Sequence, residues 1–140
     1  MSTLILDNEA VQALRDPAHP KHKRALSFCE ATNSRSNGRH FAPHVVVVPV
    51  AVRVEAELDR TSSTSARFNL LSRSADVNLD AVRANSAATI RLRTGVSAVD
   101  ASVIQAAAEM TAPVQILTSD GGDMRSAVAQ LGVAATIIRL

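Results

Sequence analysis

The fold class follows most directly from one stretch of the chain, Val45-Val-Val-Val48-Pro49-Val-Ala-Val-Arg-Val-Glu55. Four consecutive β-branched residues are typical of a strand that is buried on both faces. Proline is well suited to the first position of a helix, so the sequence predicts a helix from Pro49 to about Arg60. A buried strand that passes directly into a helix indicates an α/β domain with a mainly parallel sheet.

Strands and helices alternate along the rest of the chain as well. Short apolar runs predict further strands at residues 4–6, 77–79, 114–117 and 135–138. Helices are expected at residues 9–15, 21–32, 66–73, 80–94, 97–110 and 124–131. Ser97 and Asp100 have the spacing of a capping box at the start of one of these helices. We see no repeat or linker, so residues 1–140 are expected to form one domain.

Composition excludes several classes of protein. The single cysteine, Cys29, cannot form an internal disulfide, which fits a reducing cytosol. The longest apolar run, residues 45–52, is too short to cross a bilayer, and residues 1–7 do not resemble a signal peptide, so a cytoplasmic protein is expected. A net charge of +2 permits nucleic-acid binding without identifying it. Only three phenylalanines represent the aromatic residues, which argues against base-stacking platforms.

Acidic residues follow several of the predicted strands. Ligands of a parallel sheet bind beyond the carboxyl ends of its strands. Five carboxylates are expected to converge on that edge: Asp7, Glu55, Asp100, Asp120 and Asp123. Two carboxylates about 4 Å apart repel by roughly 4 kcal/mol at an effective dielectric of about 20, so such a cluster calls for a cation. All-oxygen ligands favour Mg²⁺ or Mn²⁺, and the matching chemistry is phosphodiester hydrolysis.

Each of these acids also has a purely structural explanation. A helix cap or a turn position would explain Asp7, Asp100, Asp120 and Asp123, and a solvated surface position would explain Glu55. Taken one at a time, none of the five is specific for a metal site. Their joint order along the chain carries more information than any single residue.

Four segments together resemble the PIN-domain ribonucleases, and within them the VapC-type toxins of bacterial toxin–antitoxin pairs. The matching segments are Leu4-Ile-Leu-Asp7, Val48-Pro-Val-Ala-Val-Arg-Val-Glu55, Ser97-Ala-Val-Asp-Ala-Ser-Val-Ile104 and Ile116-Leu-Thr-Ser-Asp-Gly-Gly-Asp123. The resemblance implies a three-layer α/β/α PIN-like fold and an acidic quartet at Asp7, Glu55, Asp100 and either or both of Asp120 and Asp123. It also implies Mg²⁺ or Mn²⁺, an RNA substrate, a homodimer and a cognate antitoxin that plugs the acidic groove.

The chain departs from the family pattern after its first aspartate. Family members usually carry Ser or Thr there, whereas this chain has Asn8 and Glu9. Asn8 can still donate a hydrogen bond to a metal-bound water or a phosphate, and we assign supporting roles to Asn8 and Ser119. RNA needs positive charge beside an acidic site. The candidate RNA-binding arginines are Arg39, Arg53 and Arg60, with Arg67 and Arg73 as further options.

Two other functions fit parts of the sequence. One is a PIN fold without catalytic activity, although no acid of the quartet is missing. The other is a metal-binding α/β regulatory module, which would need a lysine at a strand end, and this chain has only Lys21 and Lys23. The apolar helix faces between residues 49 and 74 exceed what a small sheet must cover, which favours self-association.

Overall fold

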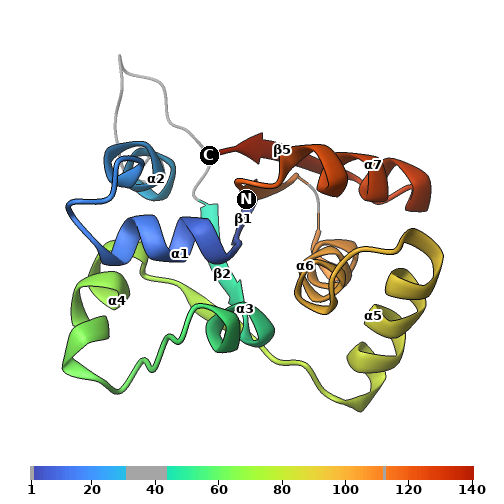
Figure 1. Ribbon diagram of the computed structural model, residues 1–140, viewed down its shortest axis with the longest axis horizontal. Coiled ribbons are helices and arrows are strands. Elements are labelled where there is room, and N and C mark those ends of the chain that lie inside the picture. Colours follow the sequence, from blue (N-terminus) through green and yellow to red (C-terminus); the bar gives the residue numbers. More distant parts are fainter. Residues whose placement is uncertain (1, 31–43, 112) are drawn as a thin grey trace.

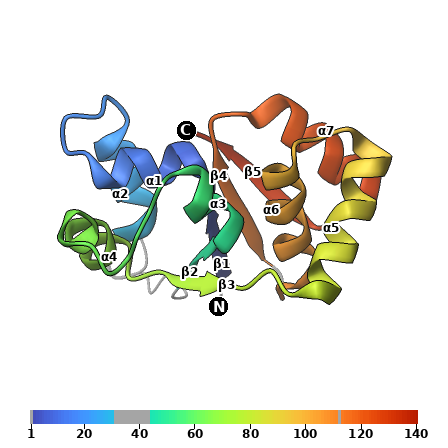
Figure 2. The ribbon, with the colours of Figure 1, turned by 60° about the horizontal axis from the view of Figure 1, so that its bottom comes forward.

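The structure is a computed structural model that describes residues 2–30, 44–111 and 113–140. Its centre is a five-stranded, all-parallel sheet with the strand order β3-β2-β1-β4-β5 (Figures 1 and 2). The strands are β1 (Ser2–Leu6), β2 (His44–Pro49), β3 (Ala75–Val77), β4 (Val114–Thr118) and β5 (Ala135–Arg139). The predicted α/β fold with a parallel sheet is therefore confirmed.

Helices cover both faces of the sheet and give the three-layer arrangement that was expected. The helices are α1 (Asn8–Arg15), α2 (His22–Glu30), α3 (Val50–Glu55), α4 (Ala66–Ser72), α5 (Ala81–Thr94), α6 (Ala98–Glu109) and α7 (Gly121–Leu131), with a short 3-10 helix at Ser63–Ser65. Helices α1, α2 and α4 pack together on one face, and α5, α6 and α7 pack together on the other (Figure 2). Helix α3 continues from the end of β2 and contacts both α1 and α6.

The core is built from the apolar runs that predicted the strands. Leu4, Ile5 and Leu6 of β1 are at most 1% exposed, because helices cover this central strand on both faces. Full burial of each such side chain stabilises the fold by about 1.5 to 3 kcal/mol. In the part of the chain that the structure describes, no helix is long and apolar enough to cross a membrane.

Helix ends follow the capping residues that the sequence offers. Ser97 accepts a hydrogen bond from the backbone N–H of Asp100 at 3.1 Å, so the predicted cap of α6 is confirmed. Asp80 caps α5 in the same way through the N–H of Arg83. Helices α5 and α7 end at Gly95 and Gly132, whose φ angles of 75° and 67° lie in the left-handed region that glycine adopts without strain.

Several element boundaries differ from the prediction, and three of them bear on the site or its surroundings. Helix α3 ends at Glu55 instead of Arg60, because the N–H of Leu58 donates to the carbonyl of Arg53 at 2.8 Å and closes the helix. This turn places Glu57 at a φ of 53° and buries the Leu58 side chain. Strand β3 occupies residues 75–77 instead of 77–79, since its ladder with β2 ends at the pair Pro49 and Val77. Helix α7 begins three residues earlier than expected.

Candidate active site at the carboxyl edge of the sheet

The parallel sheet brings the ends of β1 and β4 together. Leu6 at the end of β1 pairs with Leu117 of β4, and the N–H of Asp7 donates to the carbonyl of Leu117 at 3.1 Å. Asp7 therefore lies beside Leu117 near the end of β4, and Leu117 is three residues before Asp120. The two acids that follow these strands share one edge of the sheet, as their places in the sequence predicted.

Asp7 is the most constrained acid of the site. Its side chain is only 7% exposed. One carboxylate oxygen accepts a hydrogen bond from the N–H of Asn8 at 2.8 Å, and the other accepts one from the hydroxyl of Thr118 at 2.8 Å. Burial raises the pKa of Asp7, these two hydrogen bonds lower it, and the nearby charge of Asp120 raises it further. The balance favours the protonated acid relative to an aspartate in water.

Thr118 connects the two strand-end aspartates, and the sequence analysis did not single it out. Its hydroxyl donates to Asp7 and accepts from the N–H of Asp120 at 3.1 Å. The side chain is fully buried at the last position of β4. The sequence pattern that could have identified Thr118 is a hydroxyl residue at the end of an apolar strand, two residues before an aspartate. Thr118 fixes the orientation of the Asp7 carboxylate and the path of the chain into Asp120.

Asp100, on helix α6, is affected by the charges of the other acids of the site. It sits in the first turn of α6, where it is half-buried. Desolvation and the charge of Asp7 raise the pKa of Asp100 to about 6, with smaller contributions from Asp120 and Glu55. The Ser97 side chain opposes this rise through a hydrogen bond. Since three other carboxylates act on Asp100, the acids of four separate elements meet in one electrostatic field.

Glu55 reaches this field from the end of α3. Partial desolvation raises the pKa of Glu55, and the charge of Asp7 raises it further. Helix α3 has only six residues, so its position depends on contacts made by its ends. The carbonyl of Ala56, just beyond Glu55, accepts hydrogen bonds from the side chains of Gln12 and Arg15 on α1. The helix that begins at Asp7 thus also holds the segment that carries Glu55.

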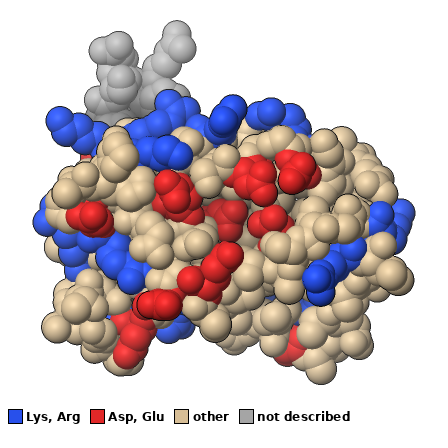
Figure 3. Space-filling view, in the orientation of Figure 1, with Lys and Arg blue, Asp and Glu red and all other residues tan. Residues whose placement is uncertain are grey.

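A polar cavity opens beside the acids at the start of α7. Its volume is about 440 Å³, and Asp100, Asp120 and Asp123 line it together with Ser97 and Ser126. Asp123 joins Asp100 and Asp120 through this cavity, whereas Asp7 does not line it. Figure 3 shows acidic side chains gathered in the middle of this face of the molecule.

The carboxylate side chains are suitable ligands for a hard divalent cation, but in this structure they lie too far apart to surround one. All five candidate ligands are carboxylates, a set that suits Mg²⁺ or Mn²⁺ better than Zn²⁺. Among the residues that the structure describes, no three His, Cys, Asp or Glu side chains lie close enough to hold a metal ion. Rotation of the more exposed acids, Glu55 and Asp120, would be needed to complete a coordination sphere around Asp7.

The other predicted site residues have different surroundings. The side-chain oxygen of Asn8 accepts a hydrogen bond from Gln12 at 3.4 Å, so Asn8 acts on Asp7 through its backbone N–H. Ser119 is exposed between the two residues Thr118 and Asp120. Arg39 lies outside the residues that the structure describes. Neither supporting residue contacts the Asp7 carboxylate through its own side chain.

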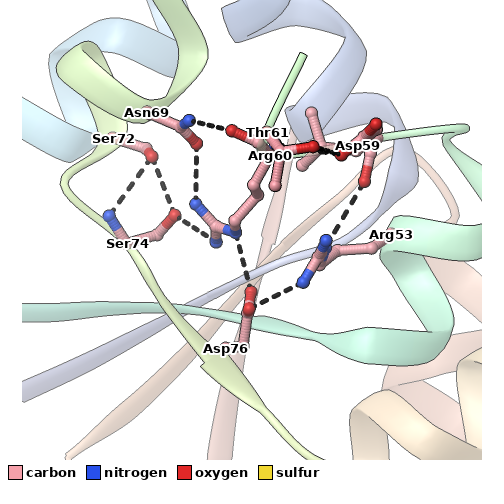
Figure 4. A network of polar contacts seen from close by, with 9 residues as sticks. Arg53, Asp59, Arg60, Thr61, Asn69, Ser72, Ser74 and Asp76 are labelled. Atoms are coloured by element: carbon pink, nitrogen blue, oxygen red, sulfur yellow. Dashed lines mark hydrogen bonds and ion pairs between the residues drawn. The ribbon is translucent and has the colours of Figure 1, made fainter. Parts of the chain in front are cut away.

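Arg53 and Arg60 belong to a polar network at β3 rather than to the acidic edge. Both guanidinium groups donate to Asp76, at 2.7 Å and 2.8 Å (Figure 4). Arg60 also donates to the side chains of Asn69 and Ser74, and it lies over the ring of Phe68 at 5.4 Å. These contacts favour a structural role for both arginines, because each guanidinium group is held by hydrogen bonds inside the protein.

Comparison with known proteins adds information on the fold. No family model and no curated protein matches the sequence. A chain of the VapBC2 complex from Rickettsia felis, solved bound to a DNA fragment from its promoter, matches with a TM-score of 0.58 and 8% sequence identity. The match covers 99% of this chain and 98% of that chain. This similarity confirms the expected PIN-like, three-layer fold over nearly the whole length of both chains.

Proposed function

We propose that this protein is a divalent-metal-dependent endoribonuclease that acts as the toxin of a toxin–antitoxin pair. The observation that carries the proposal is the mutual electrostatic field of Asp7, Glu55, Asp100 and Asp120 at one edge of the sheet. The resemblance of the motifs to VapC-type toxins and the PIN-like fold support the same reading. Fold alone does not define an activity, so the proposal depends on the acids.

The acids have separate roles in this proposal. Asp7 is the fixed ligand, since the Asn8 N–H and the Thr118 hydroxyl leave its carboxylate one orientation. Glu55 and Asp120 are the exposed ligands that would rotate toward Asp7, with Asp123 as an alternative to Asp120, and Asp100 is supplied by the first turn of α6. When bound, Mg²⁺ or Mn²⁺ would polarise a phosphate oxygen and lower the pKa of an attacking water. The positive charge of the ion would also offset the like charges that raise the pKa values of Asp7, Glu55 and Asp100.

RNA cleavage tests this proposal directly. Protein purified free of any antitoxin should cut a labelled RNA in Mg²⁺ or Mn²⁺ and stop when EDTA is added. Asp100→Asn should abolish cleavage, because it removes a carboxylate from the centre of the shared field. Asp16→Asn is the matched control, since Asp16 is an exposed acid at the far end of α1. Cleavage that survives exhaustive chelation would contradict a metal-dependent mechanism.

A PIN fold without catalytic activity is the second candidate, and one observation favours it. The acids of the described residues do not enclose a metal ion in their present separations. Isothermal titration with Mn²⁺ separates the two candidates. A ribonuclease should bind Mn²⁺ through Asp7 and Asp100, whereas a binding-only protein should give no heat that depends on these residues.

The partners of such a toxin would use different surfaces. An antitoxin would insert a basic side chain into the cavity lined by Asp100, Asp120 and Asp123 and so stop cleavage. Self-association would use the apolar faces of α3 and α4, where Val54 is 79% and Leu70 is 69% exposed. Val54→Asp should therefore reduce dimer formation in sedimentation experiments, whereas Leu92→Asp on α5 should not. Sedimentation of wild type as a monomer at high micromolar concentration would count against a homodimer.

A further inference from the structure

A basic residue borders the acidic edge at the end of β5. The parallel ladder between β4 and β5 pairs Thr118 with Arg139, so Arg139 is level with the residue that bridges Asp7 and Asp120. The Arg139 side chain runs alongside Gly121, where an added Cβ atom would lie 3.6 Å from the Cβ of Arg139. Gly121 directly follows Asp120. The carboxyl edge of the sheet therefore changes from negative to positive charge between β4 and β5.

Arg24 of α2 extends this positive charge. Its guanidinium donates to the carbonyl of Arg139 at 3.0 Å and lies over the ring of Phe28 at 5.5 Å from the centroid. Both contacts hold the guanidinium in place while the Arg24 side chain stays exposed. A guanidinium has five N–H donors, so further donors remain for an external acceptor. Arg24 is thus a pre-positioned surface cation.

Lys21 continues the row toward α1. Its ammonium group lies 3.6 Å from a carboxylate oxygen of Glu9, and the same oxygen lies 3.3 Å from a ring nitrogen of His19. Glu9 is in the first turn of α1, two residues after Asp7. We call Lys21, Arg24 and Arg139 the basic rim. Figure 3 shows basic side chains along the top of the molecule, where Figure 1 has α2 and β5, above the acidic side chains in the middle of this face.

We propose that the basic rim binds the phosphate backbone of a single-stranded nucleic acid and holds it along the acidic edge. This inference rests on the proposed function for the identity of the ligand, and it locates the path of the substrate. An acidic site repels a polyanion, so attraction must come from cations that border it. Arg53 and Arg60 are less suited to this role, because both guanidinium groups are bound to the Asp76 carboxylate on β3, at the other end of the sheet from β5.

The rim predicts a specific change in the salt dependence of binding. A fluorescent single-stranded RNA oligonucleotide is titrated with protein in EDTA, where no metal-dependent cleavage can occur, at a series of salt concentrations. Each phosphate contact to a single strand contributes about 0.7 to the slope of log affinity against log salt. Arg24→Gln with Arg139→Gln should therefore reduce the slope by about 1.4 and the affinity at about 0.1 M salt by roughly 25-fold.

The matched control removes the same charge from another part of the surface. Arg91 and Arg93 are exposed arginines in the last turn of α5, and α5 lies on the opposite side of the molecule from α2 (Figures 1 and 2). Arg91→Gln with Arg93→Gln should leave the slope within experimental error of wild type. Arg24→Lys should retain most of the affinity, because it keeps the positive charge. Melting curves establish that each variant is folded, and Arg139→Glu alone replaces the double variant if that one is unstable.

Several outcomes would contradict the proposal that the basic rim binds the phosphate backbone. Equal losses in the rim and control variants would mean that only net charge matters. An unchanged slope in the rim variants, or no RNA binding by wild type in EDTA, would exclude the rim as a phosphate-binding surface. Failure of the proposed function is a separate result, because it is measured as absence of cleavage in Mn²⁺. A protein that binds RNA through the rim but never cuts it would keep this inference and remove the nuclease proposal.

Discussion

Replacing Asp7 with asparagine should raise the melting temperature of the metal-free protein and abolish its response to Mn²⁺. Asp7 is 7% exposed, and both burial and the charge of Asp120 raise its pKa. Two carboxylates roughly 6 to 10 Å apart repel by about 2 to 3 kcal/mol at an effective dielectric of about 20. Loss of the charge-assisted hydrogen bond from Thr118 offsets about 1 kcal/mol of this relief. The net gain of about 1 to 2 kcal/mol corresponds to roughly 3 to 8 °C for a domain of this size.

The sign of this effect depends on pH. An aspartate whose pKa is raised by folding contributes full stability only when protonated, below its ordinary pKa of 3.8. That stability is lost as the pH rises through the raised pKa. The advantage of Asp7→Asn should therefore be small near pH 3.5 and complete near pH 7.5. Melting curves in EDTA at both pH values measure this difference, with Asp16→Asn as the exposed control on the same helix.

Mn²⁺ provides the second half of the test. At about 100 times its dissociation constant, a ligand that binds only the native state adds about 2.7 kcal/mol of stability. Wild type should gain this stability, and Asp7→Asn should gain much less, because the fixed carboxylate of the site is gone. If Asp7→Asn instead lowers the melting temperature in EDTA and keeps the Mn²⁺ response, Asp7 is a structural cap of α1. The proposed metal site would then be wrong at its centre.

Three further predictions concern Asp100, Thr118 and Arg60. Because the pKa of Asp100 is about 6, Mn²⁺ affinity should rise between about pH 5 and 7 as this acid ionises, and Asp100→Asn should flatten the profile measured by titration calorimetry. Thr118→Val should lower stability by about 1 to 3 kcal/mol in urea unfolding and weaken Mn²⁺ binding, since Asp7 loses one hydrogen bond. Arg60→Met should lower stability by about 1 to 2 kcal/mol through its contact with Asp76 and leave Mn²⁺ affinity unchanged; a loss of affinity would place Arg60 in the site.

The sequence predicted those parts of the site that depend on strand order. Asp7 and Asp120 follow apolar runs that form adjacent parallel strands, and adjacent parallel strands end at the same edge. Asp100 was expected near the N-terminus of a helix, and the helix and its Ser97 cap are present. These residues were accessible because short local patterns determine where strands and helices begin and end.

Other features depend on contacts between residues far apart in the sequence. The basic rim requires Arg24 to meet Arg139, which is 115 positions away. Arg60 was a candidate for RNA binding because RNA needs positive charge beside an acidic site, whereas the fold surrounds Arg60 with Asp76 and Asn69. The early end of α3 depends on burial of Leu58, which no local helix signal indicates. Tertiary packing therefore decided the features that the sequence analysis missed.

The contacts of helix α1 explain how the carboxylates of Asp7 and Glu55 stay near each other in the metal-free protein. Helix α1 begins at Asp7, whose carboxylate accepts the hydrogen bond of the first helical N–H. The far end of the same helix donates to the carbonyl of Ala56 through Gln12 and Arg15, directly beyond Glu55. Repulsion between Asp7 and Glu55 would move α3 outward. This movement would break both hydrogen bonds to the carbonyl of Ala56, which has no partner within α3 because it lies beyond the helix end. One eight-residue helix thus fixes the spacing of two acids from different parts of the chain, and a bound cation would relieve their repulsion without moving α1 or α3.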